Sequence, residues 1–193
     1  MSGMKPAPAT SAPLDTFDVE ACRRGDRGAL EAVFRTHAPA IASLLRRLVG
    51  PSADVEDLLQ ETFAEAIVAF PRFRGEAAVR TWLHRIAIHV AHGHLRRPRH
   101  RREVPLRDDT DARGAGATPE ERERARRLYE HLDAIDPDKR VAFVLRVIEG
   151  HSVDEIAALT GTSRAAARSR IFWARRALMK RMARDPLFAG RQP

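Results

Sequence analysis

Residues 152–184 constrain the fold more than any other segment, because they carry the signals of two helices joined by a tight turn. Ser152 is suited to cap a helix, and Glu155 three residues later completes a capping box. Gly161 can adopt the positive φ angle that a sharp turn needs. Ser163 then caps a second, longer helix that we expect to reach about residue 184. Two helices joined by a short glycine-containing turn predict a helix-turn-helix.

The second helix of this segment combines a narrow apolar stripe with a basic surface. The stripe, which should pack on the first helix, consists of Ala167, Ile171, Ala174 and Leu178. Such a helix suits insertion into the major groove of DNA, where arginine binds guanine edges or phosphates. The residues expected to contact DNA are Ser163, Arg164, Arg168, Ser169, Arg170, Phe172, Arg175 and Arg176. Phe172 could touch a thymine methyl group or a partner protein, and the alternative for the whole helix is a basic surface that only faces solvent.

The charge of the chain indicates a polyanionic partner. The formal net charge is +8 over 193 residues. Residues 121–184 hold 15 Lys and Arg against 9 Asp and Glu, whereas residues 26–97 hold 10 against 8. The basic excess therefore lies around the helix-turn-helix.

The sequence also predicts a cytoplasmic protein without membrane insertion. Cys22 is the only cysteine, so the chain has no internal disulfide and no thiolate metal cluster. No apolar run approaches the roughly 20 residues of a membrane span. The N-terminus lacks the apolar centre of a signal peptide.

The hydrophobic pattern predicts an all-α chain with two small helical domains joined by a flexible linker, the second domain carrying the helix-turn-helix. In the first domain, Asp26 should cap one helix and Pro39 should begin the next. Further helices are expected over residues 54–70, 77–97, 121–135 and 138–149, the last burying Ile148. The expected units are a disordered segment and lead-in at 1–25, a helical domain at 26–97, a linker at 98–120, the helix-turn-helix domain at 121–184 and a tail at 185–193.

The helix expected over residues 54–70 has an acidic surface opposite an apolar stripe. Carboxylates in its first turn favour the helix dipole, which is a structural reason for their presence. The dipole does not require Gln60 or Glu61, so a docking role stays open. The stripe expected to be buried consists of Val55, Leu58, Leu59, Thr62, Phe63, Ala66, Ile67 and Phe70.

Basic and aromatic residues alternate in the segment after this helix. Arg72, Phe73 and Arg74 lie in a loop, and Trp82 lies in the following helix. Bases stack on aromatic rings while arginines follow phosphates, so the segment is a candidate surface for single-stranded nucleic acid. The alternative is that Phe73 and Trp82 belong to the core.

Histidines gather near the end of the helix over residues 77–97. His89 and His92 share a face, but no cysteine or suitable carboxylate lies near them in the sequence, so we expect no metal site. The chain also lacks a P-loop, a GxSxG motif, an HExxH motif and a dinucleotide-binding glycine pattern. No cofactor and no catalytic residue are therefore predicted.

Three motifs follow one another along the chain. Residues 54–63 read DVEDLLQETF, residues 81–87 read TWLHRIA, and residues 155–157 and 168–170 read EIA and RSR. They resemble the motifs of bacterial sigma factors of the extracytoplasmic-function type, in the same order and spacing. Leu95, Arg96 and Arg97 resemble the usual ending of the second motif, and the resemblance covers residues 26–184.

The resemblance implies a sigma factor that binds core RNA polymerase and promoter DNA and directs transcription initiation at a small regulon, without being an enzyme. It also implies an anti-sigma factor as a partner. Docking on the clamp coiled coil of the largest polymerase subunit would involve Asp54, Glu56, Asp57, Gln60 and Glu61. The non-template strand of the −10 element, with one flipped base, would be bound by Arg72, Phe73, Arg74, Trp82, His84, Arg85, His89, Arg96 and Arg97. The C-terminal domain would read the −35 duplex.

Six positions depart from the usual residues of the family. Ile88 and His89 stand where Arg-Asn is common, and Gly93 stands where Asp is common, which implies a different −10 preference or weaker melting. Thr-Val and a basic residue are usual at the other three positions, Ala166, Ala167 and Trp173. Two other functions remain open. A helix-turn-helix regulator that does not bind polymerase would leave residues 54–63 without a role, and a sigma mimic that sequesters an anti-sigma factor would not need arginines facing DNA.

Overall fold

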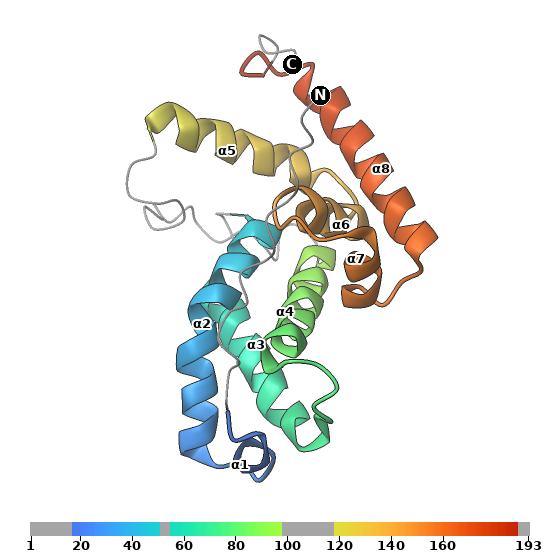
Figure 1. Cartoon of the computed structure of the whole chain (residues 1–193). Coiled ribbons are helices and arrows are strands. Elements are labelled where there is room, and N and C mark those ends of the chain that lie inside the picture. The colour runs from blue at the N-terminus through green and yellow to red at the C-terminus, as the bar shows by residue number, and fades with distance from the viewer. Residues whose placement is uncertain (1–16, 51–54, 98–117, 189–193) are drawn as a thin grey trace, which may run out of the picture.

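The computed structural model describes residues 17–50, 55–97 and 118–188, and all regular elements in these ranges are helices. This confirms the predicted all-α fold. The N-terminal unit contains α1 (Val19–Arg23), α2 (Arg27–Val49), α3 (Val55–Ala69), the 3₁₀ helix η1 (Phe70–Arg72) and α4 (Val79–Arg96). The C-terminal unit contains α5 (Pro119–Asp133), α6 (Pro137–Val147), α7 (Val153–Leu159) and α8 (Arg164–Met182), as Figure 1 shows. Asp54 and most of the expected linker lie outside the described residues.

Helix α2 is one continuous helix where the sequence predicted two. Pro39 lies inside it and is exposed to solvent. Proline removes a backbone donor and usually breaks a helix. Here the same buried stripe continues on both sides of Pro39 and packs against α3 and α4, so tertiary packing outweighs the local signal. The buried residues of the stripe are Val33, His37, Ile41, Leu44, Leu45, Leu48 and Val49.

Helix α3 buries most of its predicted stripe against α2 and α4. Ile67 is the exception, because its side chain is 51% exposed. It follows the buried Leu58 by nine residues, which places it about half a turn away around the helix. Ile67 and its neighbour Val68, which is 77% exposed, therefore lie on the outer surface of α3.

The expected lead-in contains helix α1 and belongs to the N-terminal unit. The carboxylate of Asp18 caps the helix by accepting a hydrogen bond from the amide of Ala21 at 2.8 Å. Cys22 is buried, and burial raises the pKa of its thiol. Arg23 Nε donates to the carbonyl oxygen of Phe73 at 2.8 Å. This bond ties the lead-in to the loop that follows η1, whereas the predicted disorder of residues 1–16 lies outside the described residues.

The helix-turn-helix forms as the local signals predicted. Ser152 and Glu155 make a reciprocal capping box at the start of α7, and the backbone amide of Ser152 lowers the pKa of the Glu155 carboxyl. Gly161 adopts a φ of 61° in the turn. The Ser163 hydroxyl accepts from the amide of Ala166 at 3.1 Å and caps α8. The inner side of α8 buries Ala167, Ala174 and Leu178, with Ile171 half-buried.

Three boundaries of the C-terminal unit differ from the prediction. Thr118 and Glu121 form a capping box, so α5 begins inside the expected linker. Helix α6 ends at Val147, and Ile148 is 40% exposed because the chain turns at Gly150, where φ is 77°. Residues 185–188 fold back onto α5, since buried Asp185 accepts from His131 at 2.8 Å. Residues 189–193 of the expected tail lie outside the described residues.

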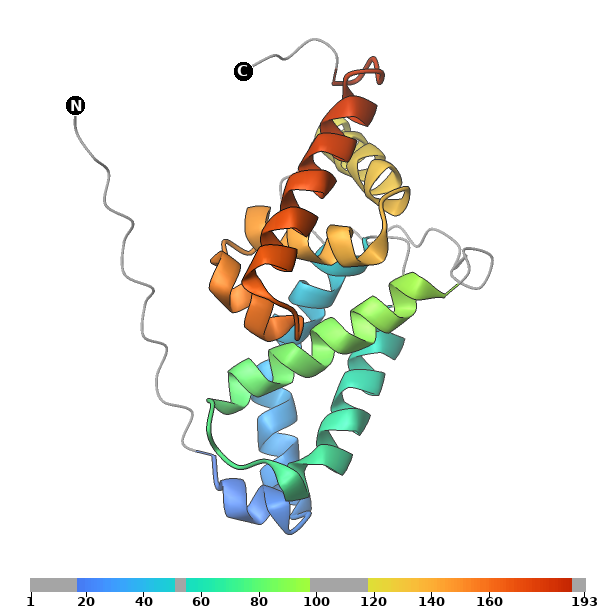
Figure 2. The same cartoon turned by 90° about the vertical axis from the view of Figure 1, so that its right-hand side faces the viewer.

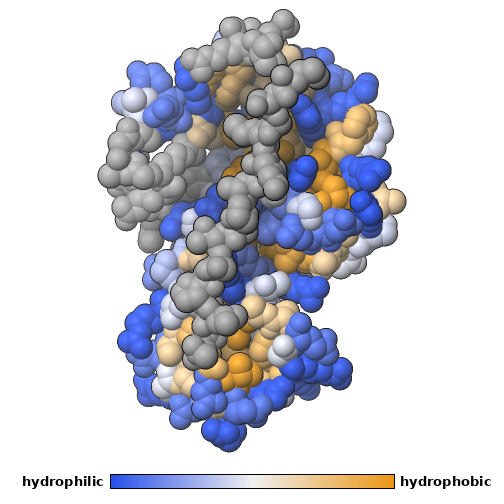
Figure 3. Space-filling model, viewed as in Figure 1, coloured by the Kyte–Doolittle hydropathy of each residue, from blue (hydrophilic) through white to orange (hydrophobic). Residues whose placement is uncertain are grey.

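The two units pack directly against each other. Helices α6 and α7 lie along α4, and the C-terminal end of α2 reaches α6, as the two views in Figures 1 and 2 agree. Among the residues coloured in Figure 3, hydrophilic ones alternate with hydrophobic areas. None of the described helices combines the length and the apolar character needed to cross a bilayer.

Candidate nucleic-acid interface

The outer face of α8 presents most of the residues predicted to contact duplex DNA. The exposed members of the predicted set are Ser163, Arg164, Arg168, Ser169, Phe172, Arg175 and Arg176. Arg164 Nε lies 3.0 Å from the carboxylate of Asp154, and both side chains remain largely exposed. The inner stripe holds the helix on α6 and α7, so these side chains project from a fixed support.

Arg170 lies on the opposite side of α8 from this outer face. It follows Ala167 by three residues and precedes Ala174 by four, so it shares the side that packs on α6. Its guanidinium donates to the Asp138 carboxylate at 2.9 Å. In this arrangement Arg170 faces Asp138, away from the exposed arginines, and its contact with duplex DNA stays a prediction.

The C-terminal half of the outer face carries an aromatic pair. Phe172 is 56% exposed, and its ring centroid lies 5.3 Å from that of Trp173. The guanidinium of Arg176 lies over the Trp173 ring at 5.9 Å from its centroid. The ring of Phe172 points away from the stripe, as the sequence predicted, and is open to a thymine methyl group or to a protein.

The aromatic residues at the loop between α3 and α4 form a cluster. Phe73 is 6% exposed, and its ring lies 4.8 Å from that of Trp82 and 5.9 Å from that of Phe70. Phe73 therefore lies in the core in this arrangement, and its stacking on a promoter base stays a prediction. Trp82 is half-buried and also packs on Phe70 at 4.7 Å. Arg72 and Arg74 are exposed beside this cluster.

His84 was also predicted to bind the non-template DNA strand, but its side chain lies mostly inside the molecule. Its buried Nε2 atom has no hydrogen-bond partner among the described residues. Burial, and next the positive charge of Arg80, lower the pKa of His84 from 6.5 to about 4. The imidazole is therefore neutral near pH 7 and supports α4 from within, which is not the position of a phosphate-binding cation.

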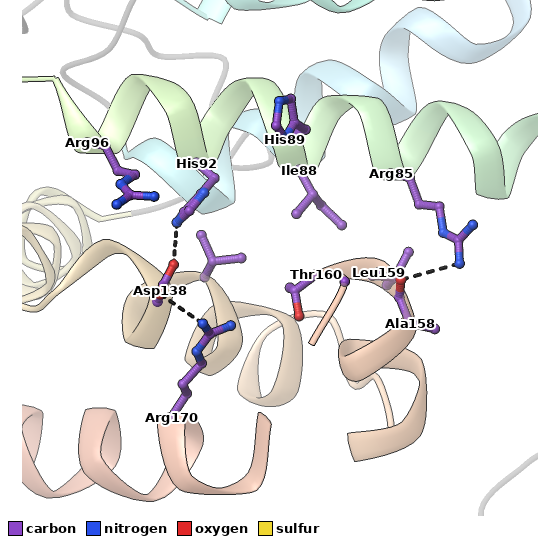
Figure 4. Close-up of a pocket in the computed structure, with 12 residues that line it drawn as sticks. Arg85, Ile88, His89, His92, Arg96, Asp138, Ala158, Leu159, Thr160 and Arg170 are labelled. Atoms are coloured by element: carbon purple, nitrogen blue, oxygen red, sulfur yellow. Dashed lines mark hydrogen bonds and ion pairs between the residues drawn. The ribbon is translucent and has the colours of Figure 1, made fainter. Parts of the chain in front are cut away.

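The other residues of α4 that were predicted to bind the DNA strand line a cavity between the two units. The cavity has a volume of about 660 Å³ (Figure 4). Arg85, exposed His89 and exposed Arg96 lie on its α4 side, and Arg85 donates to the carbonyl oxygen of Ala158 at 3.3 Å. Arg97 pairs with Glu61 at 3.5 Å and links the end of α4 to α3.

The residues that depart from the usual family pattern occupy different environments. Ile88 is buried at the interface of the units, and His89 beside it is exposed. A side-chain Cβ at Gly93 would meet no atom within 4 Å, so packing does not require glycine there. Ala167 belongs to the buried stripe of α8, whereas Trp173 lies on the surface.

The outer surface of α3 combines carboxylates with aliphatic side chains. Glu56, Asp57 and Gln60 are exposed, and Glu61 is partly covered by its pair with Arg97. Sequence reasoning missed Ile67 and Val68, which lie on the same side of α3 as Gln60 and Glu61, two turns further along. Their exposure could have been found from the helical angle, because both fall outside the arc of the buried stripe.

Metal ligation has no candidate in the described ranges. No group of three or more His, Cys, Asp and Glu side chains there is arranged to hold a metal ion. His92, one of the clustered histidines, contacts Asp138 with its Nε2 at 2.5 Å.

Comparison with known proteins identifies both units. Residues 33–102 match Sigma-70 region 2, and residues 125–178 match Sigma-70 region 4. RNA polymerase sigma factor CarQ of Myxococcus xanthus is 39% identical over 154 residues, which cover 79% of this chain and 88% of CarQ. The ECF RNA polymerase sigma-E factor of Escherichia coli K12 is 34% identical over 179 residues, covering 85% and 92%. The chain belongs to the ECF RNA polymerase sigma factors.

Solved structures agree with this membership. CnrH, in complex with the cytosolic domain of CnrY, has a TM-score of 0.60 with this sigma factor at 26% identity, covering 86% of this chain and 96% of CnrH. The sigma factor RpoE of Bartonella quintana, in complex with the anti-sigma factor NepR, has a TM-score of 0.57 at 21% identity and supports the fold alone. As a sigma factor, the chain binds core RNA polymerase and promoter DNA and directs transcription initiation, while the polymerase carries out the chemistry.

Proposed function

We propose that this sigma factor divides promoter recognition among three surfaces. The outer surface of α3 docks on the clamp coiled coil of the largest polymerase subunit. The loop after η1 and the α4 side of the cavity bind the non-template strand of the −10 element. The outer face of α8 reads the −35 element as duplex DNA.

The observation that carries this proposal is the outer face of α8. Arg168, Arg175 and Arg176 are exposed on a helix whose start is capped by Ser163 and whose inner side is a stripe of small apolar residues. A rigid helix with arginines on one side can enter the major groove, where arginine binds guanine or phosphate. Phe172 on the same face adds an apolar contact suited to a thymine methyl group.

The −10 surface draws on fewer residues than the sequence predicted. Arg72, Arg74, Arg85, His89 and Arg96 are the side chains that can reach a strand. Trp82 offers the accessible part of its half-buried ring for stacking. Phe73 and His84 support this surface from within.

The sigma factor acts in the cytoplasm at a small set of promoters, and an anti-sigma factor controls it. The support for control by a protein partner is the likeness to CnrH, which was solved in complex with the cytosolic domain of CnrY. The support for a cytoplasmic location is the partner polymerase, since a sigma factor works where transcription takes place.

The test is transcription by holoenzyme reconstituted from core polymerase and this chain. The template is a promoter library randomised over the −10 and −35 regions, and permanganate footprinting detects melted thymines. We expect enrichment of two sequence elements at a fixed spacing, with melting confined to the downstream element. Duplex binding without any gain in polymerase-dependent transcription would instead assign the chain to the helix-turn-helix regulators that do not bind polymerase.

A further inference from the structure

A second cavity, with a volume of about 550 Å³, lies where the C-terminal half of α8 packs on α5. Both views, in Figures 1 and 2, place this contact at the end of the molecule opposite α1. Arg127 and His131 of α5 line one wall, and Lys180, Arg181 and Arg184 line the other. None of the residues predicted to contact DNA or polymerase belongs to this lining. A cavity of this volume is in the range of small-molecule sites.

The wall formed by the end of α8 carries three cationic side chains that lack acidic partners. Lys180, Arg181 and Arg184 are all exposed, and their spacing of three and four residues brings them to one side of the helix end. Among the described residues, no carboxylate forms an ion pair with any of the three. Three like charges that face one cavity attract an anion with several negative charges.

The opposite wall is held in place by a buried carboxylate. Asp185 is 6% exposed, and it accepts from Nε2 of His131 at 2.8 Å and from the amide of Leu187 at 3.0 Å. The Leu187 amide, and next the hydrogen bond from His131, lower the pKa of the Asp185 carboxyl, which is therefore charged near pH 7. Arg127 lies 3.6 Å from Asp185 and also donates to Glu130 at 2.9 Å. The acidic groups at the cavity thus pair with the α5 side, and the three cations of the α8 side are left for a ligand.

Linked phosphate groups match this arrangement best. Arginine binds phosphate oxygens in a bidentate manner, and lysine adds a compact charge. One phosphate monoester carries about −1.5 to −2 charges at pH 7, which is less than three cations require, whereas two linked phosphates carry enough. Ala177 and Pro186 add a small apolar surface to the lining, suited to a sugar or a base. The phosphates of a DNA strand are instead spaced along its length and bring fewer charges into one cavity.

We propose that the cavity between α5 and α8 is a binding site for a nucleoside diphosphate or triphosphate. Lys180, Arg181 and Arg184 bind the linked phosphates, and Ala177 and Pro186 contact the nucleoside. The ion pairs of Asp185 keep α5 and the end of α8 together around the ligand. The site is independent of the surfaces that we assign to DNA and polymerase.

The test is isothermal titration calorimetry on the full-length chain at constant ionic strength. The probes are ADP, inorganic pyrophosphate and orthophosphate, and a DNA duplex of mixed sequence is titrated separately. The cavity variants are the pair Arg181→Gln with Arg184→Gln and, separately, Lys180→Gln. The pair Arg27→Gln with Arg35→Gln is the matched control, because it removes two positive charges from exposed positions of α2.

We expect the parent to bind one ADP or one pyrophosphate per chain, and to bind orthophosphate at least about tenfold more weakly, because it makes fewer charge-assisted hydrogen bonds. Each cavity variant should lose about tenfold or more in ADP affinity for the same reason. The control pair should match the parent. Because all substituted positions are exposed, circular dichroism should be parental throughout, and if the double variant does not fold, Lys180→Gln decides.

Three results would overturn the proposal. The first is a parent chain that shows no saturable binding of ADP or pyrophosphate. The second is an equal loss of affinity in the cavity variants and in the control pair, which would indicate attraction to the net charge alone. The third is weaker duplex binding by the cavity variants together with no ADP binding by the parent, which would assign the cavity to DNA phosphates. Binding of the parent to core polymerase tests the sigma function separately from all three.

Discussion

At the loop between α3 and α4, the ring and the backbone of Phe73 have separate structural roles. The ring closes the cluster with Phe70 and Trp82, and the carbonyl accepts from Arg23 of α1. The position of the exposed residues Arg72 and Arg74 thus depends on a buried neighbour. Phe73 can therefore matter to the proposed strand-binding surface without touching DNA.

Replacing Phe73 with Ala should lower the free energy of unfolding by about 3–5 kcal/mol, because a buried aromatic ring is lost and a cavity remains. Urea denaturation followed by circular dichroism measures the change. Arg74→Ala, at an exposed neighbour, is the control and should stay within about 0.5 kcal/mol of the parent. A Phe73→Ala variant as stable as Arg74→Ala would mean that the ring does not belong to the core.

The low pKa of His84 should make the fold sensitive to acid. Between its ordinary pKa of 6.5 and the folded value of about 4, the unfolded chain binds a proton at His84 and the folded chain does not. The free energy of unfolding should therefore fall as the pH decreases through this window, and the contribution of His84 is fully present only above it. His84→Gln should lose less stability than the parent between about pH 7 and pH 5. His89→Gln, at an exposed position of α4, should follow the parent, and identical pH dependence in all three proteins would refute the assignment.

A substitution at Arg168 should test directly whether the outer face of α8 binds duplex DNA. Arg168→Ala should weaken duplex binding by about 1–3 kcal/mol and relax the preference at one base pair if the side chain binds a base. If it binds a phosphate, all sequences should weaken equally and the salt slope should shrink by about one. Fluorescence anisotropy at several salt concentrations separates these results. Arg122→Ala, on the exposed side of α5, controls for net charge, and an Arg168→Ala variant that binds like this control would contradict the recognition-helix assignment.

At the scale of helices, the sequence predicted best where the signals are local. The capping box of Ser152, the turn at Gly161 and the cap at Ser163 depend on residues within one turn of each other, and all three form as expected. The prediction that a new helix begins at Pro39 was wrong, because packing on both sides of Pro39 keeps α2 continuous. The environments of Arg170 and Phe73 could not be predicted from the helical pattern, because they are set by contacts with Asp138 and Trp82, which belong to other elements.

The burial of each residue of α3 indicates which side of the helix is available for a protein contact. Its carboxylates and Gln60 surround two exposed aliphatic residues, Ile67 and Val68. Exposed apolar residues rimmed by polar ones are typical of a protein contact. We therefore propose Ile67 and Val68 as additions to the predicted docking set, whose member Asp54 lies outside the described residues.

Val68→Ser and the pair Asp57→Ala with Gln60→Ala should each weaken binding to core polymerase. The stability should change by no more than about 0.5 kcal/mol, because these positions are exposed. Titration with labelled chain measures the affinity, and Glu31→Ala on the exposed side of α2 is the control. Parental affinity in both variants would remove the docking role of α3.

At the scale of the whole molecule, the two units pack against each other through contacts that the helical patterns do not predict. The pattern of each helix identifies its own buried side but carries no information on which distant carbonyl Arg140 will meet. The contact to Leu48 joins residues more than ninety positions apart. The relative position of the two units is therefore set by contacts between side chains that lie far apart in the sequence.

Run-off transcription on fragmented genomic DNA, with the start sites mapped, tests the sigma function most directly. Core polymerase supplemented with this chain should initiate at a small set of discrete sites that share two upstream elements at constant spacing. Core polymerase alone should not use these sites. Start sites that do not differ with and without the chain would contradict the account, whatever its affinity for DNA.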